Sequence, residues 1–121
     1  LKIWDGFGIS PDGKTLYVRH DKGGMIAYDV TGEKAVEKYV AGLEQNAKDL
    51  CAASIIDDGE TVYFTTSTGE VGAALPKDGS IVWRHKITHS MINTPVPVSK
   101  RAVVVTGVEG DVMLIEEKTK R

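Results

Sequence analysis

The residues that could do chemistry in this sequence are a few histidines and two pairs of neighbouring carboxylates. His85 and His89 are four residues apart. On a helix that spacing would place two potential metal ligands on one face. The residues around them favour a strand that leads into a loop, and no cysteine or carboxylate completes a ligand set. We therefore predict no metal ligand in this sequence.

The carboxylate pairs, Asp57-Asp58 and Glu116-Glu117, contain the groups that general acid–base catalysis uses. Asp58 is needed by an expected tight turn and the glutamates lie near a terminus, so we expect solvated charges at both pairs. Gly6-Phe7-Gly8 lacks the remaining glycine and the following helix of a dinucleotide loop. The serines belong to no nucleophile motif. The sequence thus predicts no catalytic and no cofactor-binding residue.

Cysteine usage and charge narrow the classes of function further. Cys51 is the single cysteine, so no internal disulfide forms, and its apolar neighbours favour a small buried side chain. The formal net charge is −2 and the basic residues are scattered, which leaves no footprint for nucleic acid. No apolar run reaches the roughly 18–20 residues of a membrane span. Because the sequence begins at Leu1, we expect a processed chain or an excised part of a longer one.

A repeated spacing of short apolar runs predicts the strands of this chain. Short β-type runs begin at Leu16, Val62 and Val103, at intervals of 46 and 41 residues. A glycine follows seven residues after each of these positions and opens a second apolar run; the three are Gly23, Gly69 and Gly110. Strand-forming units at this period are typical of propeller blades. We therefore predict an all-β fold made of β-propeller blades of four antiparallel strands.

The repeat predicts about three blades in a single propeller segment over residues 1–121. Blade 1 is expected at about 5–41, blade 2 at about 51–88 and blade 3 at about 92–117. The strands are expected at 6–10, 15–19, 25–28 and 35–40, then 52–56, 61–65, 70–75 and 81–86, and finally 94–98, 102–106 and 111–115.

Hairpin turns are expected between the first two strands of each blade. Asp12-Gly13 and Asp58-Gly59 separate extended segments, and glycine tolerates the positive φ that tight turns require. In blade 3 this turn is formed by Ser99-Lys100-Arg101. Two prolines lie in the segment before it, and proline cannot donate a backbone hydrogen bond to a neighbouring strand.

Blade 3 lacks an outer strand. The segment Leu1-Lys2-Ile3-Trp4 resembles Ser80-Ile81-Val82-Trp83, the expected outer strand of blade 2. We expect it to complete a blade like blade 3, with Leu1, Ile3 and Trp4 as assembly residues. Propellers close with about four to eight blades, so a second copy or further blades of a parent chain are expected to complete the ring.

The turns after the third strands carry a family resemblance. Residues 27–32, Ala-Tyr-Asp-Val-Thr-Gly, and residues 74–79, Ala-Leu-Pro-Lys-Asp-Gly, resemble the Ala-Leu-Asp…Thr-Gly…Trp signature of PQQ-like (quinoprotein-type) propeller repeats. Trp83 falls four residues after Gly79, where that family places its tryptophan, whereas Val36 stands there in blade 1. Residues 10–18 also resemble YVTN-type surface-protein propellers.

The resemblance implies structural roles for these residues. The turn aspartate or threonine bonds nearby backbone N–H groups, glycine supplies a left-handed conformation, and the tryptophan covers a neighbouring blade while its N–H finds a carbonyl. The structural blade motif then comprises Gly23, Gly69, Gly110, Asp29, Gly32, Gly79 and Trp83.

Three functions are compatible with the resemblance. The first is a non-catalytic scaffold or protein-interaction module, with no cofactor in this segment and a protein as a possible partner. The second is a fragment of a PQQ-dependent quinoprotein dehydrogenase, in which PQQ and a metal sit over the central channel of a complete ring. The third is an extracellular surface-layer or adhesion repeat. The resemblance favours an extracytoplasmic location, periplasmic or at the cell surface.

Overall fold

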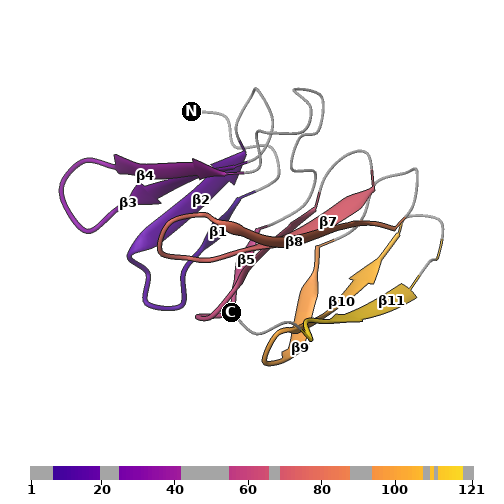
Figure 1. Cartoon of the computed structure of the whole chain (residues 1–121). Coiled ribbons are helices and arrows are strands. Elements are labelled where there is room, and N and C mark those ends of the chain that lie inside the picture. Colours follow the sequence, from indigo (N-terminus) through magenta and orange to yellow (C-terminus); the bar gives the residue numbers. More distant parts are fainter. Residues whose placement is uncertain are drawn as a thin grey trace.

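The chain forms three antiparallel sheets that stand side by side (Figure 1). The computed structural model describes residues 7–19, 25–41, 55–65, 69–87, 94–107, 110 and 112–118. Within these ranges the chain has eleven strands and no helix. The predicted all-β fold is therefore confirmed.

Each sheet follows the chain order of its strands, and we call the three sheets blades 1, 2 and 3. Blade 1 contains β1 (Gly8–Ile9), β2 (Thr15–Arg19), β3 (Met25–Asp29) and β4 (Val36–Ala41). Blade 2 contains β5 (Ile56–Asp57), β6 (Val62–Thr65), β7 (Glu70–Ala74) and β8 (Ile81–Lys86). Blade 3 contains β9 (Val96–Ser99), β10 (Ala102–Thr106) and β11 (Val112–Glu116).

The strands lie where the repeat predicts them, with differences at their ends. Among the described residues, the first strands β1 and β5 have two residues each; residue 6 and residues 52–54 of the five-residue strands that the sequence predicted lie outside the described residues. The expected strand at residues 1–4 lies outside the described residues. The Asp-Gly turns have the predicted backbone, since φ is +75° at Gly13 and +99° at Gly59. In blade 3 the positive φ, +60°, falls on Arg101 instead of a glycine.

Alternation along the strands gives each blade two apolar faces, as a period of two requires. We call the face toward the next blade in the sequence the forward face. The forward face of blade 1 packs on the backward face of blade 2 in one buried cluster, made of Tyr17, Met25, Ala27, Ala41, Ile55, Val62, Phe64 and Ala74. A second cluster joins blades 2 and 3 and contains Tyr63, Val71, Ala73, Val103 and Val105.

The first strands of blades 1 and 2 are also in direct backbone contact. The Ile55 N–H donates to the Phe7 carbonyl at 2.9 Å. A side chain at Gly8 would overlap the carbonyl of Ile55, so only glycine permits this approach. The blades are therefore closest at β1 and β5.

A glycine in the middle of blade 2 gives a direct test of this packing. A methyl group at Gly72 would overlap the ring of Phe64, which is buried with an exposed fraction of 1%. We expect Gly72→Ala to lower the free energy of unfolding by about 1–3 kcal/mol through overpacking.

The matched control for this substitution is Gly32→Ala. Gly32 has no positive φ, and a methyl group there meets no atom within 4 Å. Its free energy of unfolding in urea should stay within about 0.5 kcal/mol of the parent value. Equal effects of the two substitutions would contradict the packing described.

Candidate binding groove and inter-blade contacts

A buried tyrosine–carboxylate bond links blades 1 and 2. The Tyr17 hydroxyl, on a side chain that is 0% exposed, donates to Asp57 Oδ2 at 2.7 Å. Asp57 Oδ1 accepts from the Gly59 N–H at 2.8 Å. Burial, and then the hydrogen bond to Asp57, raises the pKa of Tyr17. The expectation of a solvated Asp57 is wrong, because this residue is only 9% exposed and faces the neighbouring blade.

A second contact between these blades comes from β4. The Tyr39 hydroxyl donates to the Pro76 carbonyl at 2.9 Å. A side chain at Gly79, where φ is +76°, would overlap the Tyr39 ring. Tyr39 pairs with Ala27 as Trp83 pairs with Ala73.

Tyr39, and not Val36, therefore occupies the tryptophan position of blade 1. Counting from the turn glycine failed because the path from Ala27 to Tyr39 is two residues longer than the path from Ala73 to Trp83. Tyr39 is found instead from the strand pairing, because it lies opposite Ala27 as Trp83 lies opposite Ala73.

The turns use aspartate in the way that the family motif implies. Asp29 Oδ1 accepts bonds from the hydroxyl and the N–H of Thr31, and these bonds lower the pKa of Asp29. In blade 2 the role passes to Asp78, whose Oδ1 accepts from the Ser80 N–H at 2.9 Å. The left-handed conformation expected at Gly32 is wrong, because Gly32 has no positive φ.

Of the other glycines of the motif, two lie within the described residues and one does not. Gly69 and Gly110 have φ values of +93° and +97°. Gly23 lies outside the described residues, as do Cys51, His89 and the segment 1–4. The roles assigned to these residues stay predictions.

Trp83 lies on β8, between blades 2 and 3. Its ring centroid is 6.3 Å from that of Tyr63, with a tilt of 50°. Trp83 packs against the second cluster, together with Ile115 of β11. This position agrees with a tryptophan that covers the neighbouring blade.

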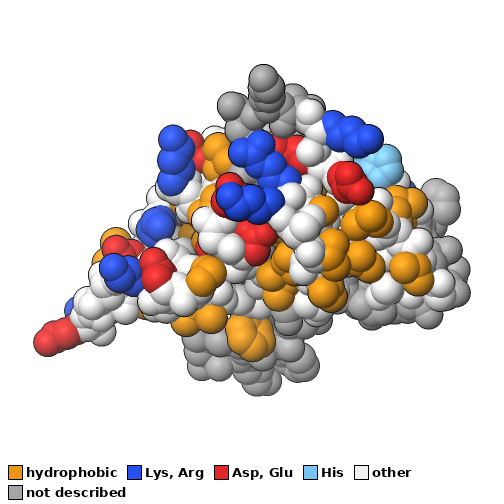
Figure 2. Space-filling model, turned by 90° about the horizontal axis from the view of Figure 1, so that it is seen from below, with side chains coloured by type: hydrophobic (Ala, Val, Ile, Leu, Met, Phe, Trp, Pro, Cys, Tyr) orange, Lys and Arg blue, Asp and Glu red, His pale blue; other side chains and the backbone are white. Residues whose placement is uncertain are grey.

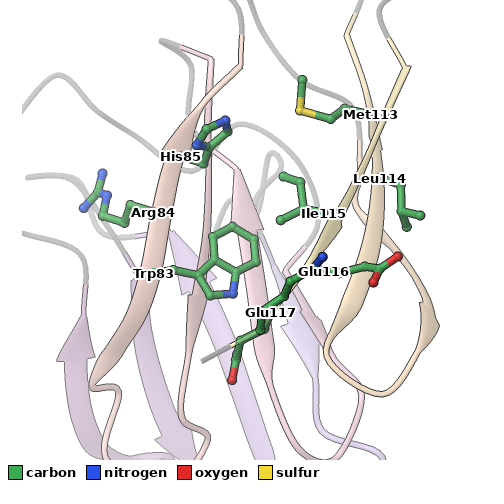
Figure 3. A pocket seen from close by; sticks show the side chains of 9 residues that line it. Trp83, Arg84, His85, Met113, Leu114, Ile115, Glu116 and Glu117 are labelled. Carbon is green, nitrogen blue, oxygen red and sulfur yellow. The ribbon is translucent and has the colours of Figure 1, made fainter. Parts of the chain in front are cut away.

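A groove of about 390 Å³ lies between β8 and β11. Trp83, Arg84 and His85 form one wall, and residues 113–118 form the other. Trp83 and Ile115 point toward each other across the groove, whereas Arg84 points away from it (Figure 3). The groove is thus mainly apolar at its centre.

The groove runs beside an open sheet edge. In blades 1 and 2 the third strand pairs with a fourth, β4 or β8. In blade 3 the sheet order is β11-β10-β9, so β11 is an edge among the described strands. The groove therefore lies where the fourth strand of blade 3 belongs.

The forward face of blade 3 is exposed, although the same positions are buried in the other blades. Val71 is 0% exposed, and its repeat equivalent Val112 is 72% exposed. Ala73 is 0% exposed, and its equivalent Leu114 is 53% exposed. Hydrophobic side chains gather over the side of the molecule that holds β9–β11 (Figure 2). Blade 3 thus exposes an apolar forward face, whereas the forward faces of blades 1 and 2 are each covered by the next blade.

The charged groups around the groove form no reactive set. No three His, Cys, Asp or Glu side chains of the described ranges are placed to hold a metal ion. The Glu117 side chain is 3% exposed and its Oε2 lies 3.9 Å from Arg101 Nη1, so the expectation of a solvated Glu117 is wrong. Within the same ranges, nothing forms a helix with the length and hydropathy that crossing a bilayer requires.

These sheets and their contacts define a segment of a β-propeller built from PQQ-like repeats. Residues 5–121 match the family described as outer membrane protein assembly factor BamB, and the chain belongs to that family. Comparison with curated proteins finds no match.

Among solved structures, the crystal structure of BamB from Moraxella catarrhalis has the same fold, with a TM-score of 0.74 and 21% sequence identity. The match covers 92% of this chain and 33% of that chain, so the sequence spans about a third of the related protein.

The position of Trp83 gives a stability prediction. Trp83→Ala removes a half-buried aromatic side chain from the junction of blades 2 and 3. We expect the free energy of unfolding to fall by about 3 kcal/mol, the lower end of the range for large core aromatics. The exposed Lys86 on the same strand is the control, and Lys86→Ala should change stability by less than about 0.5 kcal/mol. An unchanged free energy of unfolding in Trp83→Ala would show that packing of the indole does not stabilise the junction of blades 2 and 3.

The buried hydroxyl of Tyr17 gives a prediction on pH. Its folded pKa lies above the ordinary value of 10.0, so its contribution to stability is complete below that pH and is lost as pH rises further. Between about pH 9 and 11, we expect the free energy of unfolding to fall less steeply in Tyr17→Phe than in the parent protein. Equal slopes in urea titrations over this range would refute the raised pKa.

Proposed function

We infer that this chain is a non-catalytic propeller segment that acts as a scaffold or protein-interaction module. The observation that carries this proposal is the apolar forward face of blade 3, where Val112 and Leu114 are 72% and 53% exposed. Large exposed apolar surface in a folded domain marks a contact with another protein surface. The family description, an assembly factor for outer membrane proteins, supports the same class of function.

The partner that fits this face best is another blade. Equivalent positions in blades 1 and 2 are covered by the sheet that follows them, and repeat units bury their faces only against neighbours. Further blades of a parent chain or a second copy of this chain would provide that surface. The related structure has about three times the matched length, which agrees with a ring larger than three blades.

The described inner strands do not suit the quinoprotein alternative. PQQ is an anionic quinone, so a site for it needs basic side chains near the channel that the innermost strands surround. The residues of these strands are Gly8, Ile9, Ile56, Asp57, Val96, Pro97, Val98 and Ser99, none of which is basic. The carboxylate of Asp57 is already bonded to Tyr17.

The location that this function implies is extracytoplasmic. The family description places its members in the assembly of outer membrane proteins, which supports this location. An adhesion or surface-layer repeat would share that location, and the open apolar face suits it equally. The two functions differ in what the apolar face binds. A scaffold module binds another propeller blade, whereas an adhesion repeat binds the surface of a host cell.

Association through the forward face of blade 3 can be tested directly. We expect the chain to sediment as species larger than 13.1 kDa and Leu114→Lys to shift it toward the monomer, because a buried lysine would be unpaired at the contact. Leu114 is already 53% exposed, so the free energy of unfolding of the monomer should change by less than about 0.5 kcal/mol.

Val36→Lys is the matched control for this experiment. Val36 is an apolar residue that is 61% exposed on β4, away from blade 3. Its substitution should leave the sedimentation profile unchanged. A parent protein that is monodisperse at 13.1 kDa would contradict the proposed association.

A further inference from the structure

We propose that a polar crevice between blades 1 and 2 binds an acidic side chain of a partner protein, whose carboxylate is held by Lys38 and Lys77. The proposal rests on the proposed function, a protein-interaction module, and it adds a second contact surface and the chemistry of the group that this surface recognises. The lining residues lie between positions 10 and 77 and are all described, so the site requires neither the exposed face of blade 3 nor either end of the chain.

The crevice has a volume of about 420 Å³ and lies between the turns of two neighbouring blades. Blade 1 contributes the β1–β2 turn and side chains of β2 and β4, and blade 2 contributes the β5–β6 and β7–β8 turns. The lining includes the buried Tyr17, whose hydroxyl donates to Asp57 across the junction. The lining side chains are polar apart from Pro11 and Pro76.

Lys38 reaches into this crevice because β4 has an extra residue there. The register of β3 and β4 shifts between Ala27 and Tyr28, and Lys38 is the extra residue. Such a β-bulge re-aims a side chain relative to strict alternation. The Lys38 Nζ donates to Thr15 Oγ1 at 3.2 Å, which places the ammonium group over the start of β2. This bond uses one of the three N–H donors of an ammonium group and leaves two for a bound group.

The equivalent position at the next junction is apolar. In blade 2 the extra residue of the outer strand is Val82, which packs against the cluster that joins blades 2 and 3. The residue of blade 3 that pairs as Asp57 does is Pro97. Packing of one blade on the next therefore does not require Lys38, and its charge is available for a contact with another molecule.

The two acidic residues that line the crevice are already bonded within the chain. Asp12 Oδ1 accepts from the Ser10 hydroxyl at 2.6 Å and from the Lys14 N–H at 2.9 Å. Asp57 accepts from Tyr17 and from the backbone of the β5–β6 turn. These bonds hold both carboxylates in place, and their negative charges stay close to the site. A ligand with two negative charges, such as a phosphate dianion, is therefore repelled more strongly than a carboxylate.

Lys38 and Lys77 provide the donors for that carboxylate from opposite walls. Lys38 belongs to blade 1 and Lys77 to the β7–β8 turn of blade 2, and both are exposed. Asp29 and Asp78 lie near these lysines outside the crevice, and each accepts bonds from its own turn. Charge-assisted N–H···O bonds from two ammonium groups favour a carboxylate over a neutral amide of the same shape.

The size of the crevice indicates that the carboxylate belongs to a larger group. A volume of about 420 Å³ exceeds what a carboxylate alone fills. The rings of Pro11 and Pro76 offer apolar contacts to the methylene groups of a glutamate side chain. The walls are formed largely by surface turns, between which a segment of another protein can enter. The site therefore fits a glutamate of a partner protein better than a small free carboxylate.

Titration with short peptides, followed by ¹⁵N NMR of the protein, tests this site. The probe is Ala-Ala-Glu-Ala-Ala, blocked at both ends so that its glutamate carries the only charge. We expect it to shift the amide signals of Lys38, Gly59 and Lys77 along a saturable curve. The same peptide with glutamine in place of glutamate should bind about tenfold more weakly or worse, because it lacks the charge.

A matched pair of double variants tests the two lysines. Lys38→Gln combined with Lys77→Gln should weaken binding of the glutamate peptide by about tenfold or more. Lys34→Gln combined with Lys86→Gln removes the same charge from exposed lysines outside the crevice and should leave the affinity unchanged. The midpoints of urea unfolding of both double variants should match that of the parent protein, because all of these lysines are exposed.

Each other outcome overturns the proposal. Equal binding of the two peptides, or equal effects of the two double variants, would remove Lys38 and Lys77 as the carboxylate donors. Acetate that binds as tightly as the peptide would show a site for a free carboxylate, and phosphate that binds more tightly than acetate would contradict the selection by charge. No peptide binding in a protein that still sediments as an assembly sensitive to Leu114→Lys would leave the scaffold function intact and remove the crevice as a contact surface.

Discussion

A propeller blade cannot bury both of its faces alone, and the structure of this chain follows from that constraint. Tyr17, Met25 and Ala27 are buried only because blade 2 packs on them, and Tyr63, Val71 and Ala73 depend in the same way on blade 3. Because the blades approach one another closely, some positions between them have no room for a side chain and are occupied by glycine. Gly8 meets the Ile55 backbone and Gly79 meets the Tyr39 ring. Sheet packing thus explains both the apolar repeat and the glycines that interrupt it.

The two junctions are held by different contacts, although the repeat units are similar. Between blades 1 and 2 the Tyr17 hydroxyl bonds the buried carboxylate of Asp57. Tyr63 is the repeat equivalent of Tyr17, but the residue that pairs with Val103 as Asp57 pairs with Val62 is Pro97, which has no carboxylate. The second junction instead places Trp83 against Ile115 and the ring of Tyr63. A buried polar bond has a directional requirement that apolar packing lacks, so the first junction fixes the relative position of its blades more narrowly.

The sequence predicted the strands because both determinants of a strand are local. Period-two alternation and turn residues such as Asp12-Gly13 are read from neighbouring positions. The burial of Asp57 and Glu117 could not be predicted in this way, because their partners, Tyr17 and Arg101, are 40 and 16 residues away. Tyr39 was missed for a different reason, namely a longer turn that shifted the count. The groove has no sequence motif at all, since it is produced by the position of β11 next to β8 in space.

Four aspartates of the described ranges bond atoms of the chain's own turns and blades. Asp12, Asp29 and Asp78 bond turn atoms, which lowers their pKa values, and Asp57 joins two blades. Among the described residues, the edge of β11 and the forward face of blade 3 are backbone and apolar side chain that no other strand covers. Such a surface can bind an extended segment or a sheet face through backbone bonds and apolar packing. Recognition of this kind suits a member of an assembly-factor family, because it selects a partner by the same rules that stack one blade on the next.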